Sequence, residues 1–165
     1  MSSQLASTVV RQLRARAETV ATAESLTGGL LGVLLTTVPG ASDSYVGGVI
    51  SYATRLKATL AGVDTDTLRS FGPVAERTAQ EMASGVCRIC QADWGLATTG
   101  VAGPDPQDGH PVGEVYVAVA HPASGLLRAE ALSLSGDRAT IRRAAAEHAV
   151  GLLAAALEVA ESSAE

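Results

Sequence analysis

Two side chains in this 165-residue chain have the chemistry to make a nucleophile between them. Ser25 lies between a short β-favouring segment at residues 19–23 and an apolar, helix-like segment at residues 28–37. Lys57 is the only lysine, beside eleven arginines. A buried lysine can lose its proton and act as a base, which arginine does not do. Ser25 and a neutral Lys57 would form a serine nucleophile without histidine, although chance placement of one surface lysine is an open alternative.

The residues that follow Ser25 are typical of a helix start. Thr27 is a capping residue type, and Gly28 and Gly29 let a ligand approach the backbone. A helix N-terminus carries unpaired N–H groups and partial positive charge, so it suits a phosphate or a developing oxyanion. The plainer interpretation is that Ser25 or Thr27 is simply an N-cap.

Hydrophobic patterning predicts the elements that would position these residues. Helices alternate with strands, and a hairpin and a long helix follow, which indicates a three-layer α/β/α sandwich on a mixed sheet. We expect a single domain over residues 1–165 with its core at about 19–157. The predicted strands are 19–23, 46–51, 95–98, 113–120 and 127–134, and the predicted helices are one around Val9–Ala17 and others at 28–37, 56–61, 65–70, 75–90 and 137–158.

Neighbouring parallel strands would bring the ends of two of these strands together. Ser25 follows the first strand and Lys57 follows the second, so both are expected at one edge of the sheet. Gly47 and Gly48 in the second strand predict a bulge or a close backbone approach. The Gly-rich turn from Thr98 to Pro111 is a second functional candidate, because it also follows a strand.

Composition limits the partners. A net charge of −5 with no basic cluster argues against a nucleic-acid surface. Apolar runs are too short for a transmembrane helix, and residues 1–18 lack a signal-peptide core, so a cytoplasmic protein is expected. A small anionic ligand needs only one or two arginines. Arg138 and Arg142 lie four apart on a predicted helix start, where they form either a solvated face or a guanidinium pair for a phosphate.

Metal and redox chemistry have weaker sequence support. Cys87 and Cys90 are three residues apart in a predicted helix, with no second pair to complete a metal set, so buried free thiols are favoured. Asp105, Asp108 and His110 could bind a cation, but their Pro- and Gly-rich surroundings fit a solvated turn equally well. Of the three histidines, only His110 falls in this loop and is a candidate for lining a site.

Taken together, several motifs in order resemble one family. They are Thr22-Ala23-Glu24-Ser25-x-Thr27-Gly28-Gly29, Pro39-Gly40-Ala41-Ser42, Gly48…Tyr52…Lys57, Gly72-x-Val74, Thr99-Gly100-Val101-Ala102-Gly103-Pro104-Asp105, Pro111-Val112-Gly113-x-Val115-Tyr116, and Gly136-Asp137-Arg138 with Ile141-Arg142. They cover roughly residues 19–157. This set is similar to that of the CinA C-terminal domain family, also called the nicotinamide-nucleotide amidohydrolase or PncC family.

The resemblance implies deamidation of nicotinamide mononucleotide to nicotinate mononucleotide and ammonia, in pyridine-nucleotide salvage. It implies that Ser25 is the nucleophile, Lys57 its base, and Tyr52 a residue that orients or relays the proton. Neither a metal nor a cofactor is implied, and a homodimer is the favoured assembly. The residues that would hold the substrate, its oxyanion or its phosphate are Thr27, Gly28, Gly29, Thr99, Gly100, Gly103, Arg138 and Arg142.

The chain departs from the family pattern in three places. Leu26 stands where Cys is usual, Ala53-Thr54-Arg55 replaces a common Ser-Asn-Glu, and Pro106-Gln107 interrupts a loop that is normally richer in Gly. The change before Lys57 could alter substrate choice or proton relay. Two alternatives therefore stay open: a non-catalytic nucleotide-binding or competence-related module, and an amidase with another substrate.

Overall fold

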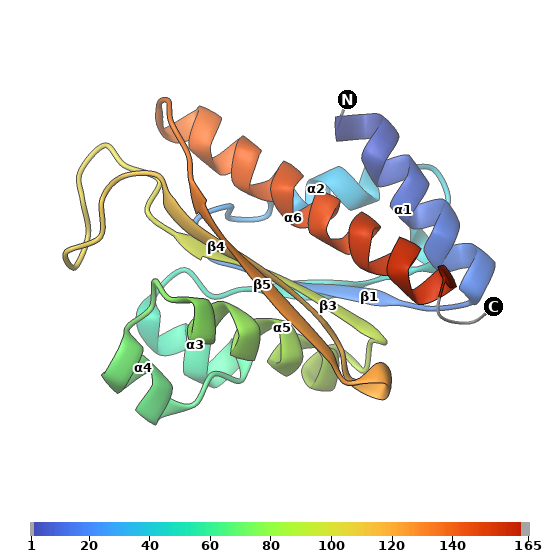
Figure 1. The fold of residues 1–165 in the computed structure, drawn as a ribbon, viewed down its shortest axis with the longest axis horizontal. Coiled ribbons are helices and arrows are strands. Elements are labelled where there is room, and N and C mark those ends of the chain that lie inside the picture. Colours follow the sequence, from blue (N-terminus) through green and yellow to red (C-terminus); the bar gives the residue numbers. More distant parts are fainter. Residues whose placement is uncertain (1, 163–165) are drawn as a thin grey trace.

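A five-stranded mixed sheet lies between two layers of helices (Figure 1). The structure is a computed structural model that describes residues 2–162, so Met1 and residues 163–165 of the predicted domain lie outside the described residues. The strands are β1 (Val20–Glu24), β2 (Tyr45–Ile50), β3 (Trp94–Gly100), β4 (Glu114–His121) and β5 (Leu126–Ser133). Their order in the sheet is β2-β1-β3-β4-β5. Strand β1 pairs in parallel with β2 and β3, whereas β3–β4 and β4–β5 are antiparallel.

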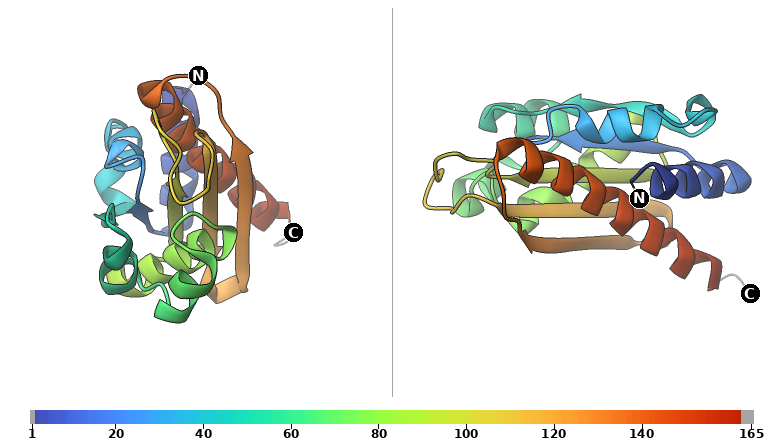
Figure 2. Two further views of the ribbon diagram at one scale, coloured as in Figure 1. Left: turned by 90° about the vertical axis from the view of Figure 1, so that its left-hand side faces the viewer. Right: turned by 90° about the horizontal axis from the view of Figure 1, so that it is seen from above.

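Each face of the sheet has its own hydrophobic core. Helices α1 (Ser2–Arg16), α2 (Leu30–Thr36) and α6 (Arg138–Ser162) cover one face, and α3 (Thr54–Ala61) and α5 (Glu76–Cys90) cover the other (Figure 2). Helix α4 (Thr65–Phe71) packs beside α5. The predicted α/β/α sandwich is therefore confirmed. Among residues 2–162, no helix has both the length and the apolarity to span a bilayer.

The burial of the strands follows from this layering. All five residues of the interior strand β1 are buried because both of its faces are covered. The edge strand β2 instead alternates between half-buried and exposed residues. Its pairing with β1 contains the expected irregularity, since Val20 pairs with Tyr45 but Ala21 pairs with Gly47. A Cβ at Gly48 would overlap the carbonyl oxygen of Thr22, so the close backbone approach is also confirmed.

The predicted elements are all present, and the helix after Ser25 shows the most informative change at its ends. Helix α2 begins at Leu30 rather than at residue 28, because Gly28 and Gly29 have φ angles of 57° and 104° and lie outside the helical region. Short 3₁₀ turns also occur at Ala41–Asp43 and Pro122–Ser124, and the second of them closes the predicted β4–β5 hairpin.

The topology creates a crevice at one end of the sheet. The chain leaves β1 toward α2 on one face and enters β3 from α5 on the other face. Parallel sheets commonly bind ligands at such a point, beyond the carboxyl ends of the strands. Ser25 directly follows β1, Ser51 and Tyr52 follow β2, and Gly100 ends β3.

Candidate functional site

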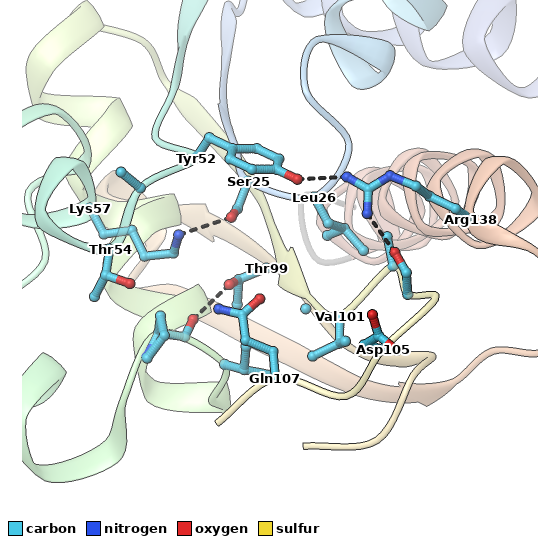
Figure 3. Close-up of a pocket in the computed structure, with 16 residues that line it drawn as sticks. Ser25, Leu26, Tyr52, Thr54, Lys57, Thr99, Val101, Asp105, Gln107 and Arg138 are labelled. Atoms are coloured by element: carbon cyan, nitrogen blue, oxygen red, sulfur yellow. Dashed lines mark hydrogen bonds between the residues drawn. The ribbon is translucent and has the colours of Figure 1, made fainter. Parts of the chain in front are cut away.

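A cavity of about 290 Å³ opens at the carboxyl ends of β1, β2 and β3. Segments from four parts of the chain line it: the turn after β1, the start of α3, the loop before α5, and the long turn after β3, with one residue of α6. Figure 3 shows polar side chains converging on this space. The lining residues are Ser25, Leu26, Tyr52, Ala53, Thr54, Lys57, Pro73, Val74, Thr99, Gly100, Val101, Ala102, Gly103, Asp105, Gln107 and Arg138.

Ser25 and Lys57 meet in this cavity. The Nζ atom of Lys57 lies 2.9 Å from Ser25 Oγ and also donates a hydrogen bond to the carbonyl of Ser51 at 2.9 Å (Figure 3). Lys57 is only 2% exposed, so it is not an ordinary surface lysine. The parallel pairing of β1 with β2 explains the meeting, because it places Ser25 beside the segment that leads into α3.

Burial also changes the protonation of Lys57. Loss of hydration lowers the pKa of its amine from 10.5 to about 8, because the charged form is disfavoured away from water. No neighbouring cation among the described residues contributes to this shift, and Arg55, two residues before Lys57, is exposed. About a tenth of this amine is therefore in the neutral form at pH 7, the form that a base requires.

Tyr52 and Arg138 close one side of the cavity. Arg138 donates from Nη2 to the Tyr52 hydroxyl and from Nη1 to the carbonyl of Gly103, both at 2.6 Å. The Tyr52 ring lies at the mouth of the cavity and is 57% exposed. Within residues 2–162 its hydroxyl makes no hydrogen bond to Ser25 or Lys57. The geometry therefore joins Tyr52 to Arg138 rather than to the Ser25–Lys57 pair.

The turn after β3 supplies backbone groups to the cavity. Thr99, Gly100 and Gly103 line it as predicted, and the Thr99 hydroxyl donates to the carbonyl of Pro73 at 2.6 Å. The N–H groups of Leu26, Ala102 and Gly103 have no acceptor among the described residues. These three amides belong to lining residues, so they are candidate donors to a ligand.

The start of α2 does not face the cavity, contrary to the sequence-based expectation. The buried carboxylate of Glu24 already accepts hydrogen bonds from the N–H groups of Gly29, Leu31 and Gly32 at 2.9, 3.1 and 2.9 Å. It also accepts one from the Thr27 hydroxyl at 2.7 Å. Glu24 thus occupies the helix N-terminus that was expected to bind substrate.

Four predicted substrate-binding residues therefore lie behind the cavity wall. Thr27, Gly28, Gly29 and Arg142 are absent from the lining. Arg142 donates from Nε to the carbonyl of Leu26 and from Nη2 to that of Thr27, each at 2.9 Å. Gly28 is in the left-handed region, and a Cβ there would lie 3.2 Å from Arg142 Nη2. These residues support the turn that carries Ser25.

Several lining residues were not among the site residues predicted from the sequence. Ala53 and Thr54 line the cavity, so two of the three family departures before Lys57 alter its wall. Asp105 and Gln107 reach it from the turn after β3, although the only role suggested for Asp105 was that of a metal ligand. Val74 and Asp105 belong to motifs of the family resemblance, and those motifs were the signal available for these two residues.

The other candidates lie elsewhere. His110 does not line the cavity and instead bonds through Nδ1 to Glu114 at 2.9 Å. No cluster of three or more His, Cys, Asp or Glu side chains among the described residues is arranged to hold a metal ion. Cys87 and Cys90 are free, and burial raises the pKa of Cys87 to about 11, which keeps it a thiol. Cys87 is buried, but Cys90 is only half-buried.

Known proteins are similar to this chain in sequence. The chain is 49% identical to a CinA-like protein of Frankia casuarinae over 138 residues, which are 84% of this chain and 31% of that protein. It is 43% identical to a CinA-like protein of Nostoc sp. over 159 residues, or 90% of this chain and 38% of that protein. The chain thus spans about a third of the length of these relatives.

Solved structures agree across nearly the whole chain. The CinA superfamily protein of Klebsiella pneumoniae superimposes with a TM-score of 0.90 at 30% identity, covering 96% of this chain and 98% of that one. The competence/damage inducible protein CihA of Agrobacterium tumefaciens gives 0.89 at 33% identity, covering 95% of each chain. The model of the family described as the CinA C-terminal domain matches residues 2–157. With its motifs, fold and relatives in agreement, the chain belongs to the CinA C-terminal domain family.

Proposed function

We propose that this protein is an amidohydrolase that converts nicotinamide mononucleotide to nicotinate mononucleotide and ammonia. The observation that carries the proposal is the buried amine of Lys57, 2.9 Å from the Ser25 hydroxyl in a cavity. A lysine with a lowered pKa and a serine within hydrogen-bond reach are the two parts of an activated nucleophile. The family resemblance points to nicotinamide mononucleotide as the substrate, and the Ser25–Lys57 geometry supports nucleophilic attack by serine.

In the proposed reaction, neutral Lys57 takes the proton of Ser25 as Oγ attacks the carboxamide carbon. The tetrahedral intermediate then collapses, the C–N bond breaks, and Lys57 returns the proton to the leaving nitrogen, which departs as ammonia. An ester between Ser25 and the nicotinoyl group remains. Water, deprotonated by Lys57, attacks this ester and releases the carboxylate, with the proton passing back to Ser25.

The oxyanion requires donors close to Ser25. The best candidates are the N–H of Leu26, next to the nucleophile, and those of Ala102 and Gly103 across the cavity, since all three lack partners among the described residues. One such donor is typically worth about 3 kcal/mol in the transition state. Arg138 is the cation in the lining that is not bonded to Ser25, so we assign it to the phosphate.

The direct test is ammonia release from nicotinamide mononucleotide by the purified protein. We expect turnover by the wild type and background release by Ser25→Ala. A second candidate function, a binding module without catalysis, draws on Ala53 and Thr54, because both departures lie in the cavity wall. If the nucleotide raises the Tm of the wild type but no ammonia appears, the hydrolase proposal is wrong and the binding module is correct.

A further inference from the structure

The charges that line the cavity include one with no assigned role. Three lining residues are ionisable groups of the kind that carry charge at neutral pH: Lys57, Arg138 and Asp105. Lys57 contacts Ser25, and Arg138 donates to Tyr52 and Gly103. The carboxylate of Asp105 makes no hydrogen bond or ion pair with any described residue, although Arg138 lines the same cavity. Its charge is therefore available to a ligand.

Asp105 is exposed on the turn that follows β3. It lies two residues after Gly103, whose carbonyl is held by Arg138 at 2.6 Å. Figure 3 shows Asp105 on the Arg138 side of the cavity, away from Lys57. When Lys57 is neutral, as the proposed mechanism requires, Arg138 and Asp105 leave the lining with one positive and one negative charge. Such a lining suits a ligand that carries an anionic group and a cationic group together.

Nicotinamide mononucleotide has this pair of charges, because its phosphate is anionic and its quaternary pyridinium nitrogen is cationic. We propose that Asp105 is a specificity-determining residue that recognises the positive charge of the pyridinium ring, and so selects the oxidised nucleotide over its neutral dihydropyridine form. The inference rests on the proposed function, which supplies the substrate. In this arrangement the ring lies between the amide group at Ser25 and the phosphate at Arg138, and Asp105 faces the ring.

The test compares two ligands that differ in ring charge and share the carboxamide, ribose and phosphate: oxidised and reduced nicotinamide mononucleotide. Binding is measured by calorimetry in a Ser25→Ala background, which prevents turnover. Asp105→Asn keeps the size of the side chain and removes its charge. Asp108→Asn is the matched control, because Asp108 is exposed on the same turn but does not line the cavity.

We expect Asp105→Asn to weaken binding of the oxidised nucleotide by about fivefold, the effect of one charge pair about 4 Å apart in a water-like medium. Binding of the reduced nucleotide should stay within twofold, and Asp108→Asn should change neither. The preference should also shrink in 1 M salt, which screens an exposed charge pair. Equal losses for both nucleotides, or no loss for either, would overturn the inference.

The result separates this inference from the hydrolase proposal. If the wild type releases no ammonia but prefers the oxidised nucleotide through Asp105, recognition of the ring charge stands and catalysis does not. If ammonia is released and Asp105→Asn leaves the preference intact, catalysis stands and the role of Asp105 is wrong. If neither nucleotide binds, both proposals are refuted.

Discussion

The protonation of Lys57 sets an expected pH dependence for turnover. With a pKa of about 8, roughly a tenth of the amine is neutral at pH 7. At the unshifted value of 10.5 that fraction would be about 3 in 10,000, so burial increases the reactive form by roughly 300-fold. The value of kcat/KM should therefore rise about tenfold between pH 7 and 9, half of that rise being reached near pH 8, and level off above pH 9.

The assay is kcat/KM for ammonia release between pH 7 and 10 at constant ionic strength, because this parameter reports ionisations of the free enzyme. Starting at pH 7 keeps the substrate phosphate mostly dianionic, since the second pKa of a phosphate monoester is about 6. Lys57→Arg is the control. It keeps the positive charge but cannot lose a proton in this range, so it should be inactive at every pH.

Two results would refute this reasoning. A flat profile from pH 7 to 9 would mean that no group with this pKa limits the reaction. A profile that rises through 8 equally in wild type and Lys57→Arg would assign the ionisation to another group and remove the lysine from the mechanism.

Three further predictions concern the groups around the nucleophile. Lys57→Met removes an amine whose pKa is lower in the folded state than in the unfolded state. Burying the charged amine destabilises the wild type by about 3 kcal/mol below pH 8, and this cost is lost as the pH rises to 10.5. Chemical denaturation should therefore show the stability of this variant, relative to wild type, falling by about that amount between pH 7 and 10.5; a constant difference would contradict the buried charge. Glu24→Gln replaces two acceptor oxygens with one and sets an NH₂ group against helix N–H donors. Urea unfolding should therefore show a loss of about 2–4 kcal/mol in the free energy of unfolding. An unchanged unfolding midpoint would contradict the role of the Glu24 carboxylate in holding the start of α2. Arg142→Lys cannot span two adjacent carbonyls, so kcat should fall about tenfold with KM within twofold, whereas a phosphate ligand would show a rise in KM.

The sequence was sufficient for the fold and for the central pair of the site. Alternating helical and strand patterns imply parallel crossovers, and the crossovers place residues that follow neighbouring strands at one edge of the sheet. This logic brought Ser25 and Lys57 together correctly, because it depends on topology and not on side-chain conformation. The sequence left the burial of Lys57 open, and the structure shows that the residue is only 2% exposed.

The direction of the turn after Ser25 could not be predicted in the same way. Strand β1 is buried on both faces, so its sequence has no alternation to show toward which helix layer Glu24 points. Only the coordinates show that its carboxylate folds back onto the start of α2. The same limit applies to Arg142. Its spacing from Arg138 correctly placed both residues on one helix, but it did not show that Arg142 donates hydrogen bonds to the carbonyls of Leu26 and Thr27.

The hydrogen bonds of the Glu24 carboxylate to the start of α2 also limit where an anionic ligand can bind. A phosphate at the N-terminus of α2 would have to displace a carboxylate from three amide donors and would lie beside that buried negative charge. Two like charges about 4 Å apart repel by about 1 kcal/mol in water and by about 4 kcal/mol near a protein surface. Arg138 lines the cavity, as Glu24 does not, and offers attraction without this penalty. The phosphate therefore belongs toward α6, which leaves the amide end of the ligand to meet the Ser25 hydroxyl.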